Sequence, residues 1–181
     1  IVGFQTLLLL FYRGSASYIA PQLFQKGTRR IFGIKTIIEG KPARGRQTMY
    51  VSNHLSYFDI PVLGSFVRGS FVARGDLSKW PIFGYMAKMQ QTIFISRERK
   101  DAIAGKTMLE TVLFEGKNIM IFAEGTSSDG SDVKLFKSSL FSLALENPSG
   151  RPLLVQPVTI SLLSVDGKPA TTTDIRDLYA W

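Results

Sequence analysis

Short apolar runs alternate with amphipathic stretches along most of the chain. Five runs rich in β-branched and aromatic residues have the length and composition of buried strands, at residues 48–52, 70–74, 92–96, 118–125 and 152–161. Stretches with helical spacing lie between them, at residues 58–67, 77–89, 101–116 and 138–147. Strands that alternate with helices imply crossover connections, so we expect an α/β fold with a mostly parallel central sheet flanked by helices.

The first 33 residues have a different pattern. Residues 1–12 carry no charge, and Arg13, Lys26, Arg29 and Arg30 follow them. This run is shorter than the roughly 20 residues that cross a bilayer. An apolar run beside basic residues is nevertheless typical of segments that lie on a membrane surface. We therefore expect residues 1–33 to form an N-terminal, membrane-associating helical segment and residues 34–181 a single domain; a docking helix of a soluble domain is the alternative.

Composition narrows the function classes. The 181 residues include no Cys and one His, which excludes disulfides, thiol nucleophiles, cysteine-based metal sites and histidine-rich metal sites. A net charge of +8 favours an anionic partner, such as a membrane surface or a phosphorylated ligand. The basic residues are scattered and no aromatic–basic recognition motif stands out, so we expect no nucleic-acid partner. Neither a metal nor a resident cofactor is expected.

The single histidine lies in "NHLSYFD", directly after the first predicted strand. His54 has the pKa range of a general base, and Asp59 can orient its ring if the two meet across a strand-to-helix turn. A regular helix would not bring residues five apart together, so the turn is required. The structural alternative is a histidine at a helix start, with Asp59 as an N-terminal cap.

Three further segments carry candidate chemistry. In "EGTSSDG", Glu124, Gly125 and Thr126 begin a polar turn after a strand, which suits an anion site or, alternatively, an ordinary loop. Arg97 follows another strand and can pair with a phosphate, although a solvated charge run is the usual outcome. Lys137 lies at a predicted helix start, where a cation is unfavourable unless an anion also binds.

These blocks, in this order, resemble those of the PlsC-type glycerolipid acyltransferase family. The resemblance is carried by "NHLSYFD", "TIFISRERK", "FAEGTSSDG" and "VQPVTIS", and it covers roughly residues 34 to 161. It implies that residues 34–181 are an acyltransferase domain that moves an acyl chain from an acyl-carrier-protein or coenzyme A thioester to a lysolipid hydroxyl. It also implies a base role for His54 and an orienting role for Asp59. It matches Arg97, Glu124, Gly125 and Thr126 to residues of acceptor binding. We also expect Asn53, Ser127 and Lys137 to bind substrate.

The chain departs from the common family pattern around Glu124, and this departure bears on the identity of the acceptor. The family commonly has Arg after the E-G-T element and Pro before the Glu, whereas this chain has Ser127 and Ala123. "EGTSSDG" resembles the variant seen in lyso-ornithine lipid acyltransferases and some bacterial PlsC-like proteins, and without that cation the resemblance favours a lyso-ornithine lipid as the acceptor over lysophosphatidic acid. The resemblance further implies a membrane-associated enzyme at the cytoplasmic face of the inner membrane. The alternatives are a non-catalytic membrane-surface binding module and an acyl thioesterase.

Overall fold

A five-stranded parallel sheet forms the centre of the computed structural model, which describes residues 15–95, 99–137, 141, 147 and 149–179. The strand order is β3-β2-β4-β1-β5. The strands are β1 (Thr48–Ser52), β2 (Ser70–Arg74), β3 (Ile93–Ile95), β4 (Ile119–Phe122) and β5 (Leu154–Val158). The predicted α/β class with a parallel sheet is therefore confirmed.

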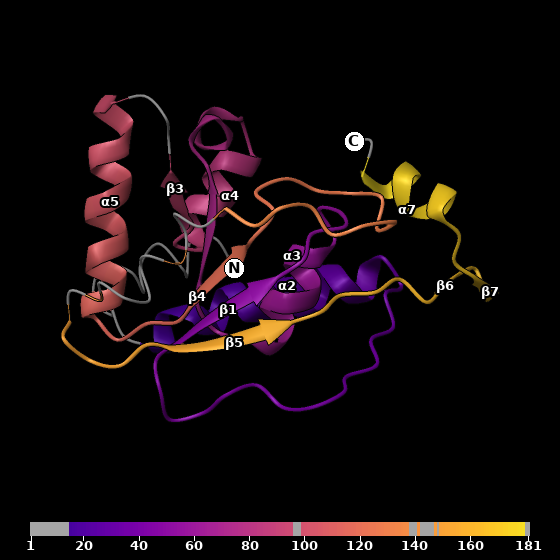
Figure 1. Ribbon diagram of the computed structural model, residues 1–181, viewed down its shortest axis with the longest axis horizontal. Helices are drawn as coiled ribbons and strands as arrows, with labels where there is room; N and C mark the ends of the chain where they lie inside the picture. Colours follow the sequence, from indigo (N-terminus) through magenta and orange to yellow (C-terminus); the bar gives the residue numbers. More distant parts are fainter. Residues whose placement is uncertain (1–14, 96–98, 138–140, 142–146, 148, 180–181) are drawn as a thin grey trace.

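Helices cover both faces of this sheet (Figure 1). The helical elements are η1 (Ser15–Tyr18), α2 (Ile19–Ile31), α3 (Asp59–Phe66), η2 (Gly75–Lys79), α4 (Phe83–Met89), α5 (Arg99–Phe114) and α7 (Thr172–Tyr179). The connections through α3 and α4 run in one direction along the sheet, and the connection through α5 returns. Because such crossovers are right-handed, α3 and α4 lie on one face and α5 on the other.

Alternating side chains of the central strands build a core on each face. On the α5 side, Met49 and Val51 of β1 pack with Ile121 of β4 and Leu113 of α5. On the α3 side, a second cluster is made of Tyr50, Leu63, Val67, Phe71 and Met120. All five residues of β1 are buried, so the strand that leads to His54 is fixed on both faces.

The N-terminal helical segment is joined to the sheet by buried polar contacts. The Tyr18 hydroxyl lies 2.6 Å from the Ser70 hydroxyl, and Gln91 donates a hydrogen bond of 2.8 Å to Ser17. Burial raises the pKa of Tyr18 to about 12. Within the described residues, no helix is both long and apolar enough to cross a bilayer. The boundary after residue 33 remains a prediction.

The structure corrects some predicted elements. The helix expected at residues 77–89 is broken into η2 and α4 around Pro81, which lacks the backbone N–H that a continuous helix needs. The observed strands β3, β4 and β5 are shorter than predicted. A hairpin of β6 (Ser164–Val165) and β7 (Lys168–Pro169), together with α7, was not predicted. The helix expected at 138–147 falls largely outside the described residues.

Candidate active site

Two loops that leave adjacent strands form the candidate active site. Residue Ser52 at the end of β1 pairs with Phe122 at the end of β4. The turn that follows β1 therefore lies beside the turn that follows β4, at the carboxyl edge of the sheet, where open α/β sheets bind ligands. Ser128 donates its backbone N–H to the carbonyl of His54 over 2.9 Å. The two sequence motifs are thus brought together.

His54 and Asp59 meet across the turn between β1 and α3. His54 Nδ1 lies 2.7 Å from Asp59 Oδ2. The same oxygen accepts the backbone N–H groups of Leu55 at 2.6 Å and Ser56 at 3.0 Å. Asp59 is 4% exposed. Its carboxylate therefore contacts the imidazole and also holds the turn. The structural interpretation of Asp59 is confirmed, and its role in catalysis remains a prediction.

The imidazole ring is fixed on one side by an aromatic ring. The rings of His54 and Phe122 are stacked, with centroids 3.9 Å apart and planes 13° apart. Phe71 packs against the same phenylalanine at 6.0 Å. Among the residues that the structure describes, none hydrogen-bonds to Nε2 of His54. The ring therefore has one nitrogen held by protein and one nitrogen available to a substrate.

Glu124 joins the two loops. It is 3% exposed, and its Oε1 accepts the backbone N–H of His54 at 3.2 Å. Its other oxygen accepts the backbone N–H of Lys134 at 3.1 Å. Both carboxylate oxygens thus accept hydrogen bonds from backbone N–H groups, so Glu124 has a structural role in addition to any contact with substrate. Its predicted role in acceptor binding remains a prediction.

The turn after Glu124 presents a small and open surface. Gly125 has a φ of +67°, and the side chain of Lys137 lies against its backbone. Thr126 and Lys137 are exposed, and Ser127 is half-buried. The carbonyl of Ser127 accepts a hydrogen bond of 2.8 Å from Nζ of Lys134. A cation is therefore placed over the turn even though the arginine common in the family is absent.

The side chain of Asn53 is hydrogen-bonded to the backbone of a neighbouring segment. Asn53 exchanges two hydrogen bonds with the backbone of Ile160, at 2.9 and 2.8 Å, and so joins the end of β1 to the segment after β5. Arg97 lies outside the described residues. The roles assigned to both in substrate binding remain predictions.

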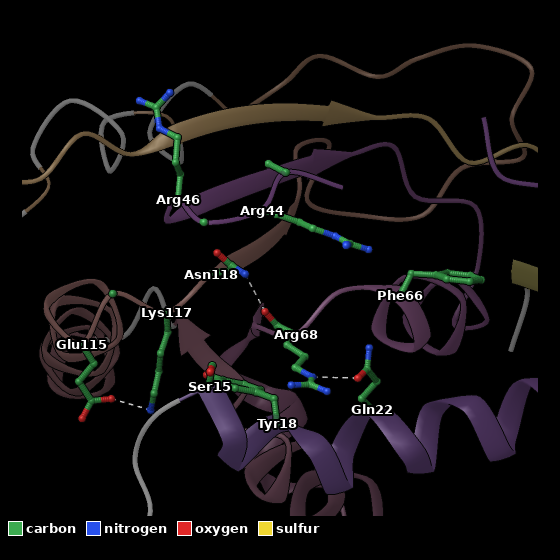
Figure 2. A pocket seen from close by; sticks show the side chains of 13 residues that line it. Ser15, Tyr18, Gln22, Arg44, Arg46, Phe66, Arg68, Glu115, Lys117 and Asn118 are labelled. Atoms are coloured by element: carbon green, nitrogen blue, oxygen red, sulfur yellow. Dashed lines mark hydrogen bonds and ion pairs between the residues drawn. The ribbon is translucent and has the colours of Figure 1, made fainter. Parts of the chain in front are cut away.

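A cavity of about 320 Å³ adjoins the two loops. Asn53, Glu124 and Ser128 line it together with apolar residues, among them Leu55 and Ile175 of α7. A larger cavity of about 730 Å³ lies at the opposite edge of the sheet, near the starts of β1, β2 and β4 (Figure 2). None of the predicted site residues lines that larger cavity. Asn53 and Glu124 line the smaller one, which adjoins the loop of His54, whereas His54 and Asp59 line neither cavity.

The comparison with known families agrees with this site. The Acyltransferase family model matches residues 34–161, a span that contains His54, Asp59 and Glu124. The chain belongs to the acyltransferase family. The resemblance inferred from the sequence motifs is thereby confirmed.

Individual relatives of this acyltransferase differ in their acceptors. The chain is 35% identical to lyso-ornithine lipid O-acyltransferase of Brucella abortus, over 100% of this chain and 68% of that protein. The equivalent enzyme of Rhizobium meliloti is 35% identical over 89% of this chain and 56% of that protein. The 1-acyl-sn-glycerol-3-phosphate acyltransferase of Neisseria gonorrhoeae is 31% identical over 59% of this chain and 43% of that protein. The chain thus spans from 43% to 68% of the length of these relatives.

A solved structure supports the fold. The 1-acyl-sn-glycerophosphate (LPA) acyltransferase PlsC from Thermotoga maritima is similar with a TM-score of 0.64. The match covers 94% of this chain and 78% of that chain, at 20% identity. At this identity the similarity concerns the arrangement of sheet and helices.

Sequence reasoning missed two residues that shape the site. Phe122 ends an apolar strand, and nothing in the local pattern indicates that it stacks on His54. Ile175 belongs to α7, whose start does have a signal: Thr171 and Asp174 form a capping pair in which the Thr171 hydroxyl donates to Asp174 over 2.7 Å.

Proposed function

We propose that the protein is an O-acyltransferase that moves a fatty acyl chain from a thioester to the hydroxyl of a lysolipid. The observation that carries this proposal is the His54–Asp59 pair, with Nδ1 and Oδ2 2.7 Å apart, beside the Glu124–Gly125 turn. A general base that has one nitrogen held and the other available suits removal of a hydroxyl proton. Family membership supplies the reaction class.

The reaction can be followed atom by atom. Asp59 accepts the Nδ1–H of His54, which leaves the Nε2 lone pair for the acceptor hydroxyl. As Nε2 takes that proton, the hydroxyl oxygen attacks the thioester carbonyl and forms a tetrahedral intermediate. The C–S bond then breaks, and the imidazolium returns the proton to the departing thiolate. Positioned base catalysis of this kind typically contributes about 10²–10⁴-fold to the rate.

Direct transfer between two bound substrates is the preferred route. The chain contains no Cys that would carry an acyl group, and no second His that would activate a serine. Binding both substrates together also contributes to the rate, because it converts an encounter of two molecules into a reaction within one complex.

A lyso-ornithine lipid is the favoured acceptor and lysophosphatidic acid the second candidate. Ser127 stands where the family commonly has an arginine, so the turn offers less positive charge to a phosphate. The relatives from Brucella abortus and Rhizobium meliloti, which match 100% and 89% of this chain, are named for lyso-ornithine lipid. Lys137, which lies over Gly125, can pair with the carboxylate of an amino-acid head group or with a phosphate.

The proposed setting is the cytoplasmic face of the inner membrane. The acyl donor is an acyl-carrier-protein or coenzyme A thioester, both of which are anionic and suit a chain of net charge +8. Ile19 and Leu23 are exposed on the outer face of α2, 39% and 57% respectively. Basic residues of the same helix, Lys26 and Arg30, suit the anionic head groups of a membrane surface.

A lipid-product assay tests the proposal. Purified protein receives acyl-carrier-protein or coenzyme A thioesters and a panel of lysolipids, and the products are identified by mass spectrometry. We expect an O-acylated ornithine lipid as the main product. Release of thiol and free fatty acid without any acceptor would instead indicate a thioesterase. If no acylated product forms with any acceptor, and no thiol is released, the chain is not the proposed enzyme.

A further inference from the structure

An apolar corner between η2 and α4 projects from the surface. The exposed fractions of its large side chains are 45% for Trp80, 72% for Ile82, 70% for Phe83 and 49% for Tyr85. These four residues lie within a six-residue stretch of sequence. Contiguous exposed apolar surface of this kind is uncommon in soluble proteins and marks a site of interaction.

The backbone is built to hold these side chains outward. Ile82 has a φ of 31° and a ψ of −62°, a conformation that a β-branched residue rarely adopts. A Cβ atom on Gly84 would lie 2.5 Å from the carbonyl oxygen of Ser78, so only glycine allows α4 to pack this closely on η2. The side chain of Ile82 is exposed, so its packing in the free protein does not offset this backbone strain. We therefore attribute the strained conformation to a function in a bound state.

The chemistry of the corner fits a lipid surface that contains anionic lipid. Trp80 and Tyr85 have the amphipathic rings that are enriched at the level of membrane head groups. The rings of Trp80 and Phe83 pack edge to face, with centroids 6.4 Å apart. Lys79 and Lys88 flank the corner and are exposed, and no acidic residue lies from 77 to 88.

The corner also lies where a lipid enzyme would need it. It follows β2 and therefore belongs to the same carboxyl edge of the sheet as His54. At the other end of α4, the side chain of Gln90 is hydrogen-bonded to Gln25 of α2. This contact joins the far end of α4 to α2, the helix whose outer face carries exposed apolar and basic residues.

We propose that the corner formed by Trp80, Ile82, Phe83 and Tyr85 inserts into the head-group region of an anionic membrane. This docking would present the carboxyl edge of the sheet, and with it His54, to lipid. The inference rests on the proposed function, because a lysolipid acceptor lies in such a membrane. It adds the specific surface that makes the contact.

Trp80 is a built-in reporter for this contact. The chain has two tryptophans, Trp80 and Trp181, so Trp181→Phe leaves Trp80 as the sole source of tryptophan emission. On addition of phosphatidylcholine vesicles that contain phosphatidylglycerol, we expect a blue shift of this emission and quenching by brominated acyl chains. High salt and pure phosphatidylcholine should weaken both effects. Emission unchanged by anionic vesicles to which the protein binds would overturn the proposal.

Substitutions within the corner test it independently of the reporter. Ile82→Gly removes the side chain and relieves the backbone strain, so it does not threaten folding, and Phe83→Ser removes an exposed ring. Each should weaken vesicle partitioning at least about tenfold in a sedimentation assay. The matched control is Phe114→Ser, which removes a ring that is 71% exposed at the end of α5. Equal partitioning of all three variants would contradict the proposal.

Docking and catalysis can be separated in the same assay. The His54→Ala variant should retain the Trp80 response to vesicles while its acyl transfer is lost, so a failed enzyme assignment does not remove the docking result. A second copy of the chain is the other possible occupant of the corner. If Trp80 emission shifts with protein concentration in the absence of vesicles, and dimers form, the corner is a protein interface and the lipid proposal is wrong.

Discussion

A single oxygen of Asp59 binds His54 Nδ1 at 2.7 Å and also accepts two backbone N–H groups of the same turn. The carboxylate thus has no rotational freedom relative to the loop that carries the histidine. The orientation of the His54 ring and the shape of the loop are therefore coupled through one atom, and substitutions of Asp59 are expected to affect both.

Replacement of Asp59 by Asn should lower kcat more than it lowers stability. The Asn carbonyl oxygen can take the place of Oδ2 and still accept all three N–H groups, but the negative charge that stabilises the imidazolium is lost. The base is therefore weakened, and we expect kcat to fall roughly 10²–10⁴-fold with little change in KM. Steady-state kinetics measure this loss. Asp76→Asn, at an exposed ion pair with Arg74, is the control and should have no effect on kcat.

Phe122 is expected to act as a positioning residue through its stacking contact with His54. Phe122→Leu keeps an apolar side chain but removes the flat surface at 3.9 Å from the imidazole. We expect kcat to fall about tenfold and KM to stay near its original value, because the base is misplaced while the substrate contacts persist. Phe71→Leu changes a neighbouring ring that does not stack on His54. If the two variants lose kcat equally, the effect is one of packing alone.

Alanine substitutions at two glycines of positive φ distinguish the effect of backbone strain from the effect of a contact at the site. Gly125 and Gly150 have φ values of +67° and +65°, so alanine should destabilise either position by about 1 kcal/mol. At Gly125 the new Cβ would also lie 2.7 Å from Cε of Lys137, whereas nothing lies within 4 Å at Gly150. Gly125→Ala should therefore displace Lys137 and raise KM for an anionic acceptor. Equal KM values for both variants would argue against a role for the Lys137 position.

Stability should decrease with pH above the ordinary pKa of tyrosine because of Tyr18. Burial raises its pKa from 10.0 to about 12, so the folded state keeps a proton that the unfolded state loses. The stabilisation is complete below pH 10 and disappears as the pH rises towards 12, by an amount on the order of 2–3 kcal/mol. Urea unfolding at pH 9 and pH 11.5 measures the change. Tyr18→Phe should be less stable at pH 9, since Ser70 loses its partner, but less sensitive to the rise in pH.

Local patterns predicted the sheet well and the connections between loops poorly. The bounds of β1 and β2 match the prediction because short runs of apolar and β-branched residues have few other ways to be buried. The contact of His54 with Asp59 followed from the need for a turn between a strand and a helix. The contact of Glu124 with the backbone of His54 could not be predicted, because it depends on the relative position of loops 70 residues apart.

The β6–β7 hairpin had a signal in the sequence that the prediction did not use. Asp166 and Gly167 both have positive φ, and an Asp-Gly pair is a strong indication of a tight hairpin such as β6–β7. By contrast, the exposure of Ile82 and Phe83 has no signature in the sequence, where apolar residues next to a predicted helix indicate a core position.

The central claim is that His54 is the base of an acyl transfer to a lysolipid. The most direct measurement compares the rate of O-acylated product formation by the unmodified protein and by His54→Ala, with lyso-ornithine lipid and an acyl thioester, after unfolding curves have shown both to be folded. We predict a loss of roughly 10²-fold or more in kcat/KM. A folded His54→Ala protein that forms the product at a rate close to that of the unmodified protein would contradict the account.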